Sequence, residues 1–197
     1  MNRPLLVVLG ATVFALMSVV FFWIFKLTLA QSMKADMVSP EHVAGYVHAI
    51  LEANRNNYTD NVVVKLQKDG IQAHEHWRDE RGVPLPAQYL MESGRLVAAK
   101  DLKFTFRLAS LTPIYQWNGP NSDAERLGLA AVERQPDVPH YGFFTKGGVR
   151  YFQAIYADRG ASQACVDCHN THPNSPRRDF KLNDVMGGII ITFPVGE

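Results

Sequence analysis

The sequence predicts an α+β domain that follows an apolar N-terminal segment. Stretches with the 3.6-residue period of amphipathic helices alternate with short runs that have the two-residue period of strands. Apolar residues make up 47% of the 197 residues and charged residues 20%, which is typical of a globular protein with a sizeable core. We therefore expect an antiparallel sheet with a layer of helices and loops. The formal net charge of +1 lacks the strongly basic character of nucleic-acid-binding proteins, so no nucleic-acid partner is expected.

The N-terminal segment is expected to anchor the chain in a membrane. Residues 4–25 contain no charged side chain and are long enough to cross a bilayer, which takes about 20 apolar residues in a helix. We expect residues 1–30 to form a single transmembrane anchor and residues 31–197 to form the folded domain. A cleaved signal peptide is the alternative, because residues 27–30 resemble a processing site, but the apolar stretch exceeds the usual length of about 7–15 residues.

A long helix is expected next. Ser39 provides an N-cap and Pro40 a first helical residue. The expected apolar face consists of Val43, Tyr46, Val47, Ile50, Leu51 and Tyr58. Residues 62–66 either continue this helix or form a strand, and Asp69 with Gly70 ends the segment. If residues 71–77 are extended, His74 and His76 point the same way and a metal-binding use is conceivable, whereas the alternative is two solvated histidines of a loop.

The middle of the chain predicts two more helices and a strand. Residues 78–86 are charged and then rich in proline, which indicates a loop, and a short helix is expected over residues 87–94, closed by Gly94. Residues 103–108 alternate between polar and apolar side chains and predict a half-buried strand. After a long connection, residues 123–135 predict a helix.

The C-terminal part predicts a hairpin and a last strand. Residues 141–144 and 149–155 are aromatic-rich runs on either side of a glycine-containing turn, which is a hairpin pattern. Residues 186–193 are rich in isoleucine and predict the final strand of the sheet.

Both cysteines of the chain lie in one motif, the run Cys165–His169, which has the form Cys-x-x-Cys-His. This is the attachment signature of c-type haem, in which two thiols bond to the porphyrin vinyl groups and the adjacent imidazole binds the iron. Two intervening residues let both sulfurs reach one porphyrin edge. The motif thus predicts one covalent haem c, with Cys165 and Cys168 as attachment sites and His169 as an iron ligand, in a loop or short helix.

Two other uses of the cysteines were considered. A disulfide or redox pair leaves His169 unexplained, and the strand-then-helix context of thioredoxin-like motifs is missing. A zinc site could combine Cys165, Cys168 and His172, but it lacks the second Cys/His pair that normally completes a structural shell.

The haem motif also predicts where the domain lies. Bacterial haem c is attached outside the cytoplasm, so we expect a single-pass protein of the inner membrane, with its N-terminus in the cytoplasm and its haem domain in the periplasm.

From Arg107 onward the sequence resembles the family of single-haem c-type domains with a PAS-like fold that was long labelled only as a domain of unknown function. The matching stretches are 107–111, 121–125, 150–151, 164–170, 172–176 and 179–188, with a looser match over residues 58–94. The resemblance implies a PAS-like antiparallel sheet that carries one haem, held by Cys165 and Cys168 with His169 as proximal ligand. Members occur as free-standing cytochromes and as periplasmic input domains of sensor kinases, cyclases and chemoreceptors.

One feature departs from this family. A family member uses a cysteine of the N-terminal helical region as the second axial ligand, and this chain has no third cysteine. The resemblance ranks His76 and His74 as the first distal candidates, because they lie near the family's distal segment, and His48 on the preceding helix as the next.

Other side chains are further candidates for contact with haem. Met91 and Met186 remain as distal alternatives, and a methionine ligand would raise the reduction potential relative to two histidines. Arg177 and Arg178 are expected to pair with the haem propionates, since guanidinium binds carboxylate through two parallel hydrogen bonds.

Two functions follow from these features. The first is electron transfer by a membrane-anchored monohaem cytochrome, as a subunit of a larger membrane redox complex or with a separate redox partner. The alternative is a haem-based redox or gas sensor that acts through a partner protein. Neither is an enzyme, and a homodimer is expected because PAS-like domains with N-terminal helices often pair.

Overall fold

The computed structural model describes residues 14, 16–28 and 38–196. The chain divides into two compact units, residues 1–39 and 40–197. In the first unit residues 16–28 are helical. None of the helices in the described ranges combines the length and the apolar character needed to cross a bilayer. Half of the span expected over residues 4–25 falls on residues 4–13 and 15, which lie outside these ranges.

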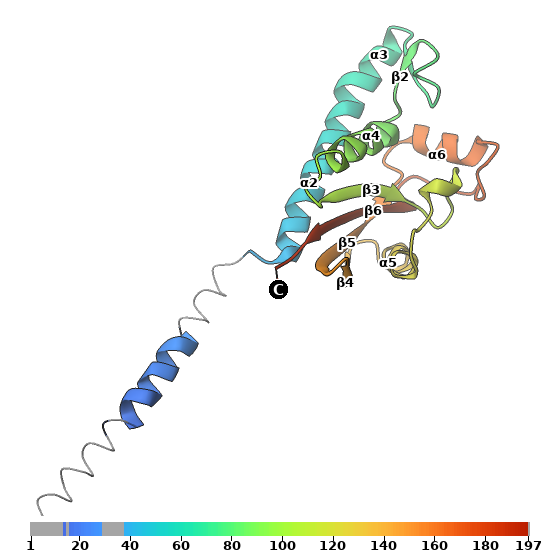
Figure 1. Cartoon of the computed structure of the whole chain (residues 1–197). Helices are drawn as coiled ribbons and strands as arrows, with labels where there is room; N and C mark the ends of the chain where they lie inside the picture. Colours follow the sequence, from blue (N-terminus) through green and yellow to red (C-terminus); the bar gives the residue numbers. More distant parts are fainter. Residues whose placement is uncertain (1–13, 15, 29–37, 197) are drawn as a thin grey trace, which may run out of the picture. The chain divides into compact units, whose positions relative to one another are not determined.

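The second unit is built on a four-stranded antiparallel sheet (Figure 1). Its strands are β3 (Thr105–Ala109), β4 (His140–Lys146), β5 (Val149–Arg159) and β6 (Val185–Pro194). Their order is β3-β6-β5-β4, so the last strand lies in the middle of the sheet. The predicted hairpin is confirmed as β4 and β5, whose turn has Gly147 and Gly148 at positive φ. The α+β architecture expected from the sequence is therefore observed.

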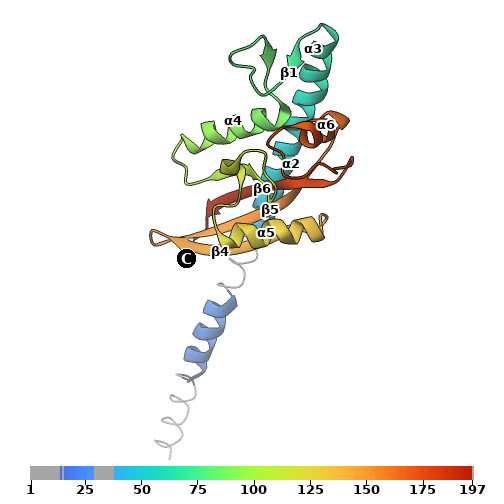
Figure 2. The same cartoon turned by 90° about the vertical axis from the view of Figure 1, so that its right-hand side faces the viewer.

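Helices cover both faces of this sheet (Figure 2). The helices α2 (Pro40–Tyr58) and α4 (Pro86–Ala98) pack on one face, and α5 (Asp123–Arg134) packs on the other. The larger core lies under α2 and α4 and is formed by Ala44, Leu51, Leu90, Phe106, Phe152, Ala154, Tyr156, Ile189 and Ile191. The smaller core under α5 consists of Ala109, Leu129, Val132, Ile155 and Ile190. Alternate residues of β5 and β6 thus enter opposite cores, as the pleat requires.

Helix α2 continues through one π-helical turn, η1 (Thr59–Val63), into the short helix α3 (Val64–Lys68). Residues 62–66, which the sequence allowed as either helix or strand, are therefore helical. Asp69 is the C-cap and Gly70 has φ +78°, so the predicted end is confirmed. The expected apolar face was partly wrong: the sheet is contacted by Ala44 and Leu51, whereas Tyr46 is 63% exposed and Ile50 59% exposed.

Two short strands, β1 (Gln72–Ala73) and β2 (Gly82–Val83), pair in parallel and enclose a loop of residues 74–81. The loop alternative for His74 and His76 is observed, because only Gln72 and Ala73 of residues 71–77 are in a strand and turns begin at Glu75. The 3-10 helix η2 (Gln116–Asn118) lies in the predicted long connection. Helix α6 (Gln163–Thr171) follows β5 and carries the cysteine motif.

The helix predicted over residues 87–94 is longer than expected, because Gly94 does not end it. Gly94 is buried inside α4 and faces β3. A Cβ at this position would lie 2.5 Å from the backbone carbonyl oxygen of Phe106. The glycine therefore serves the close approach of helix and strand rather than a helix end.

Gly94→Ala is expected to destabilise the domain. The clash with a backbone atom should cost about 3 kcal/mol, against a gain in helix propensity of about 1 kcal/mol, so the free energy of unfolding should fall by about 2 kcal/mol. Urea unfolding measures this change. The control is Gly142→Ala in β4, where a Cβ meets no atom within 4 Å. Equal stabilities of the two variants would contradict the close-packing account.

Candidate functional site

Helix α6 presents both cysteines on one side. Ser162 is its N-cap, and the Ser162 hydroxyl accepts a hydrogen bond from the backbone N–H of Cys165. Cys165 and Cys168 are three residues apart, which places their side chains on the same helix face. Both thiols are free and half-buried. Two unbonded thiols on one face are what attachment to a single porphyrin edge requires.

His169 follows Cys168 and has a nitrogen atom without a protein partner. Its ring packs edge-on against Phe180, with the ring centroids 5.6 Å apart and the planes at 89°. The Nδ1 atom is buried and has no hydrogen-bond partner among the described residues. Burial lowers the pKa of His169, and nearby His172 lowers it further, while Asp158 acts in the opposite direction. A neutral imidazole, the form that binds metal ions, is therefore favoured at neutral pH.

The helix rests on a small apolar cluster of Val166, Phe180 and Met186, with Cys165 at its edge. Asn170 fixes the segment before β6 to this helix. Its amide nitrogen donates to the carbonyl oxygen of Phe180 at 2.9 Å, and its amide oxygen accepts from the backbone N–H of Phe180 at 2.9 Å. These paired bonds hold the ring that contacts His169, so the imidazole has a fixed support.

The Cys168 thiol does not have the character of a redox-active cysteine. Burial raises the pKa of Cys168, and the nearby Glu75 and Cys165 raise it further. Reactive cysteines of Cys-x-x-Cys redox motifs have a lowered pKa instead. The environment of Cys168 is therefore unlike that of a thioredoxin-type nucleophile.

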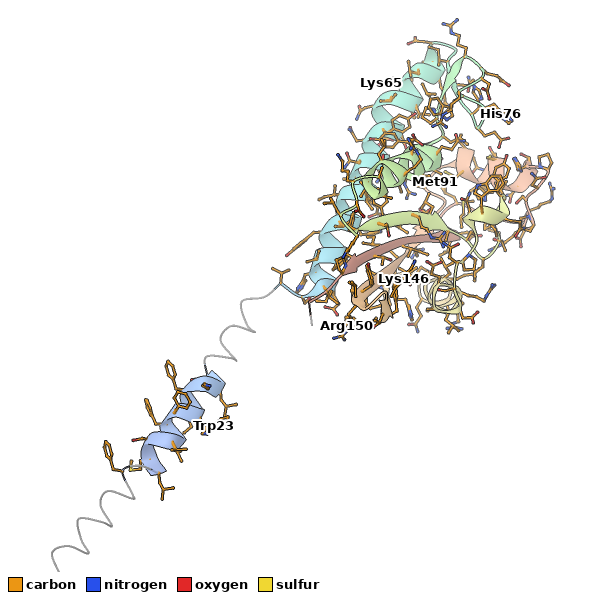
Figure 3. The ribbon with its side chains drawn as sticks, in the orientation of Figure 1. Trp23, Lys65, His76, Met91, Lys146 and Arg150 are labelled. Atoms are coloured by element: carbon orange, nitrogen blue, oxygen red, sulfur yellow. The ribbon has the colours of Figure 1, made fainter. Side chains whose placement is uncertain are left out.

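A carboxylate from a distant part of the chain reaches this helix. Glu75, in the loop after β1, accepts a hydrogen bond from the hydroxyl of Tyr115. Its Oε1 atom lies 3.3 Å from Nε2 of His172, just past the end of α6. Nε2 of His76 is 3.4 Å from the same oxygen, although the His76 side chain is largely exposed. The loop of residues 74–81, labelled at His76 in Figure 3, is thereby held against α6.

His74 lies in the same loop but faces β2. Its Nδ1 atom is 4.0 Å from Glu80, and its ring lies against the backbone of Gly82, where a Cβ would come within 2.2 Å of Nε2. The two histidines of this segment therefore have different surroundings, and of the two it is His76 that shares a carboxylate with the end of α6.

His48 lies on α2 and faces a groove of its own. Its ring stacks on Tyr156 of β5 with centroids 4.0 Å apart, and its Nδ1 is 3.9 Å from Glu52. The Nε2 atom is buried and has no partner among the described residues. The groove has a volume of about 370 Å³ and is lined by residues of α2, the end of β5 and residues 136–139, with none from α6.

The two arginines expected at the propionates have protein partners. Arg177 pairs with Asp179 at 2.7 Å and Asp184 at 3.4 Å, and its guanidinium lies over the ring of Phe180. Arg178 donates to the carbonyl oxygens of Asn170 and Pro173. Arg177 thus packs on the ring of Phe180, which in turn contacts His169. The sequence did not suggest this contact.

The two methionine candidates lie on different elements. Met186 is buried in the cluster beneath α6, and Met91 is half-buried on α4 (Figure 3). Across the described ranges, no three side chains of His, Cys, Asp or Glu are arranged to hold a metal ion, so the zinc alternative with Cys165, Cys168 and His172 receives no support there.

Comparison with protein families gives a match over residues 30–194 to the family described as Tll0287-like. The chain belongs to the Tll0287-like family. This is a family of cytochrome-like domains, and its match covers every described strand and helix of residues 40–194 together with the cysteine motif. No curated protein matches the chain significantly. Membership in the Tll0287-like family agrees with the family resemblance inferred from the sequence at the level of a cytochrome-like domain.

Several residues of the site were not singled out from the sequence. Glu75 and Tyr115 are 40 residues apart, and Glu75 and His172 are 97 apart, so no local pattern connects them. Asn170 and Phe180 fell within stretches that match the family, but nothing in the sequence indicated that they bond to each other.

His48 makes the stability of the domain depend on pH. Burial lowers the pKa of His48 below its ordinary value, with Arg55 acting in the same direction and Glu52 and Asp158 opposing it. The unfolded chain then binds the proton more tightly, so this contribution to stability is complete above the unfolded pKa of about 6.5 and is lost as the pH falls. The free energy of unfolding should decrease between about pH 7.5 and pH 5.5, and the decrease should be smaller in His48→Phe. Identical slopes in the two proteins would contradict this expectation.

Proposed function

We propose that the chain is a membrane-anchored c-type cytochrome of the electron-transfer class, with one haem bound covalently to α6. The observation that carries the proposal is the pair of free thiols on one helix face followed by a neutral imidazole with a buried, unpartnered nitrogen. Bound there, haem supplies an iron atom that carries single electrons between its ferrous and ferric states. The resemblance implies a PAS-like fold, and the antiparallel sheet with β6 between β3 and β5 supports it.

Different residues of this chain would have different roles in binding the haem. Cys165 and Cys168 provide the thioether positions, and His169 provides the proximal nitrogen. Phe180 and Asn170 hold the imidazole and the helix in place. Cys168 is half-buried, so its surroundings shield the attachment edge from water in part, which lowers the local dielectric constant.

For the second axial position we propose the loop of residues 74–81, with His76 ahead of His74. Glu75 brings this loop to the end of α6, whereas His48 faces a groove that α6 does not line. Ordinary rotation of the His76 side chain is enough to change its direction, because that side chain is 62% exposed and its contact with Glu75 lies at the surface.

We propose that the N-terminal segment anchors the domain in the inner membrane and leaves the domain in the periplasm. Large apolar side chains on residues 16–28 are exposed all around the helix, among them Phe21, Phe22, Trp23 and Phe25. A helix that is apolar on all sides is normally buried in protein or lipid. The redox partner would then be a protein or complex of the same membrane, and a homodimer is part of this proposal.

Sensing through a partner protein is the second candidate, and one contact favours it. Arg55 of α2 donates to Asp158 at 2.6 Å, and Asp158 also acts on the pKa of His169. A change of charge at the iron would thus change the electrostatic energy of Asp158 and of its partner Arg55 on α2. This helix follows the N-terminal segment in the chain.

Ligand binding to the reduced protein separates the two functions. An electron carrier with two axial protein ligands should keep its reduced spectrum when carbon monoxide is added. Rapid formation of a carbon monoxide complex would instead favour gas sensing and count against the proposed electron carrier. His76→Ala is expected to open the iron to carbon monoxide, and His48→Ala, the matched control, is expected to leave it closed.

A further inference from the structure

Glu75 connects three segments that are far apart in the chain. It comes from the loop after β1, while Tyr115 precedes η2 and His172 follows α6. The Tyr115 hydroxyl donates to one carboxylate oxygen, and Nε2 of His172 lies 3.3 Å from the other. The ring of Tyr115 also meets the ring of His172 edge-on, with centroids 5.7 Å apart. We call Glu75, Tyr115 and His172 the carboxylate cluster.

The cluster lies beside the cysteine nearest to the iron ligand. Burial is the main cause of the raised pKa of Cys168, and Glu75 adds to it. The pKa of Tyr115 is raised mainly by its hydrogen bond to Glu75, and Cys168 adds a smaller contribution. The ring of Tyr115 stacks on Trp117, with centroids 4.7 Å apart, and Trp117 is exposed. His172 is itself bonded to α6, because its backbone N–H donates to the carbonyl oxygen of Cys168 at 2.9 Å, so the cluster lies at the end of α6 that follows Cys168.

The carboxylate of Glu75 is held in its charged form. The hydrogen bond from Tyr115 lowers the pKa of Glu75, and His172 and His76 lower it further, whereas partial burial opposes them. The Glu75 side chain is 28% exposed, so solvent screens its charge only in part. A negative charge thus stands at the C-terminal end of α6, 3.3 Å from His172.

We propose that Glu75 is a positioning residue that fastens the loop of residues 74–81 to α6, and that its negative charge lowers the reduction potential of the haem. This inference rests on the proposed haem site. Ferric iron carries one more positive charge than ferrous iron, so a nearby anion stabilises the oxidised state. At the effective dielectric constant of about 20 that applies near protein surfaces, the interaction energy of two unit charges several ångströms apart is large enough to measure.

The test separates charge from position by using two variants of the haem-loaded protein. Glu75→Gln keeps an oxygen that accepts from Tyr115 but removes the charge. It should raise the ratio of reduced to oxidised protein at fixed ambient potential about tenfold, which corresponds to about 59 mV for a one-electron couple. Glu80→Gln is the matched control, because Glu80 lies in the same loop and is largely exposed, and it should change this ratio little. A ratio in Glu75→Gln that equals that of the control would overturn the electrostatic part of the proposal.

Position is read from amide hydrogen exchange in the same proteins. Glu75→Ala removes both bonds, so exchange in residues 74–81 should become at least about tenfold faster, while Glu75→Gln should stay close to the wild type. Unchanged exchange in Glu75→Ala would overturn the positioning role. Failure of the proposed function is seen separately, because the wild-type protein would then carry no covalent haem, whereas failure of the present inference would leave a normally loaded protein.

Discussion

Replacing Cys165 and Cys168 together with serine is expected to abolish covalent haem attachment. Serine keeps the shape of the side chain but its hydroxyl does not add to the porphyrin vinyl groups as a thiol does. The purified variant should show the mass of the bare polypeptide after denaturation and should lose its haem absorbance on extraction with acid and organic solvent. Each single substitution should leave one bond, and Cys168→Ser should be the more damaging because that thiol adjoins His169 in the chain.

The control for this experiment lies inside the motif. Asp167 is exposed on α6 between the two thiols in the sequence, and its side chain accepts a hydrogen bond from Gln163. Asp167→Asn should therefore retain full haem content. Loss of haem from this variant, or normal covalent haem in the double serine variant, would contradict the assignment of the two thiols.

Phe152→Ala is expected to have the largest effect on stability. Phe152 is completely buried in the centre of the sheet, and its ring contacts those of Tyr141, Phe143 and Phe193. Removing such a ring from a packed core costs about 3–5 kcal/mol, which is a large part of the total stability of a domain of this size. Chemical denaturation should show this loss in the midpoint without a change of fold at low denaturant.

Phe144→Ala is the matched control on the neighbouring strand. Phe144 is partly exposed on β4 and stacks on Tyr151 at 5.3 Å, so its removal should cost about 1 kcal/mol. If the two variants were equally stable, the core would not be centred on Phe152 as described.

The elements that depend on local pattern could be predicted. The hairpin of β4 and β5 follows from aromatic runs around Gly147 and Gly148, and the helix predicted over residues 123–135 is observed as α5. The buried face of α2 was harder to predict, because helical spacing also places Tyr46 and Ile50 on the expected apolar face. The sheet is in fact contacted by Ala44, which a search for large apolar residues overlooks.

The site could be predicted only where its chemistry is contiguous in sequence. Cys165, Cys168 and His169 form such a unit and lie together on one helix. Glu75 reaches this helix through the fold alone, and so do the ion pairs of Arg177 with Asp184 and Asp179. The pairing of Arg177 and Arg178 with haem propionates stays a prediction. Long-range polar contacts of this kind have no signature in a single sequence.

The mass of the protein after export in a host that matures c-type cytochromes tests the central claim most directly. After denaturation the chain should weigh its polypeptide mass plus one haem, and a peptide containing residues 163–171 should carry all of the added mass. A chain with only its polypeptide mass and without absorbance in the Soret region would contradict the haem assignment and every proposal built on it.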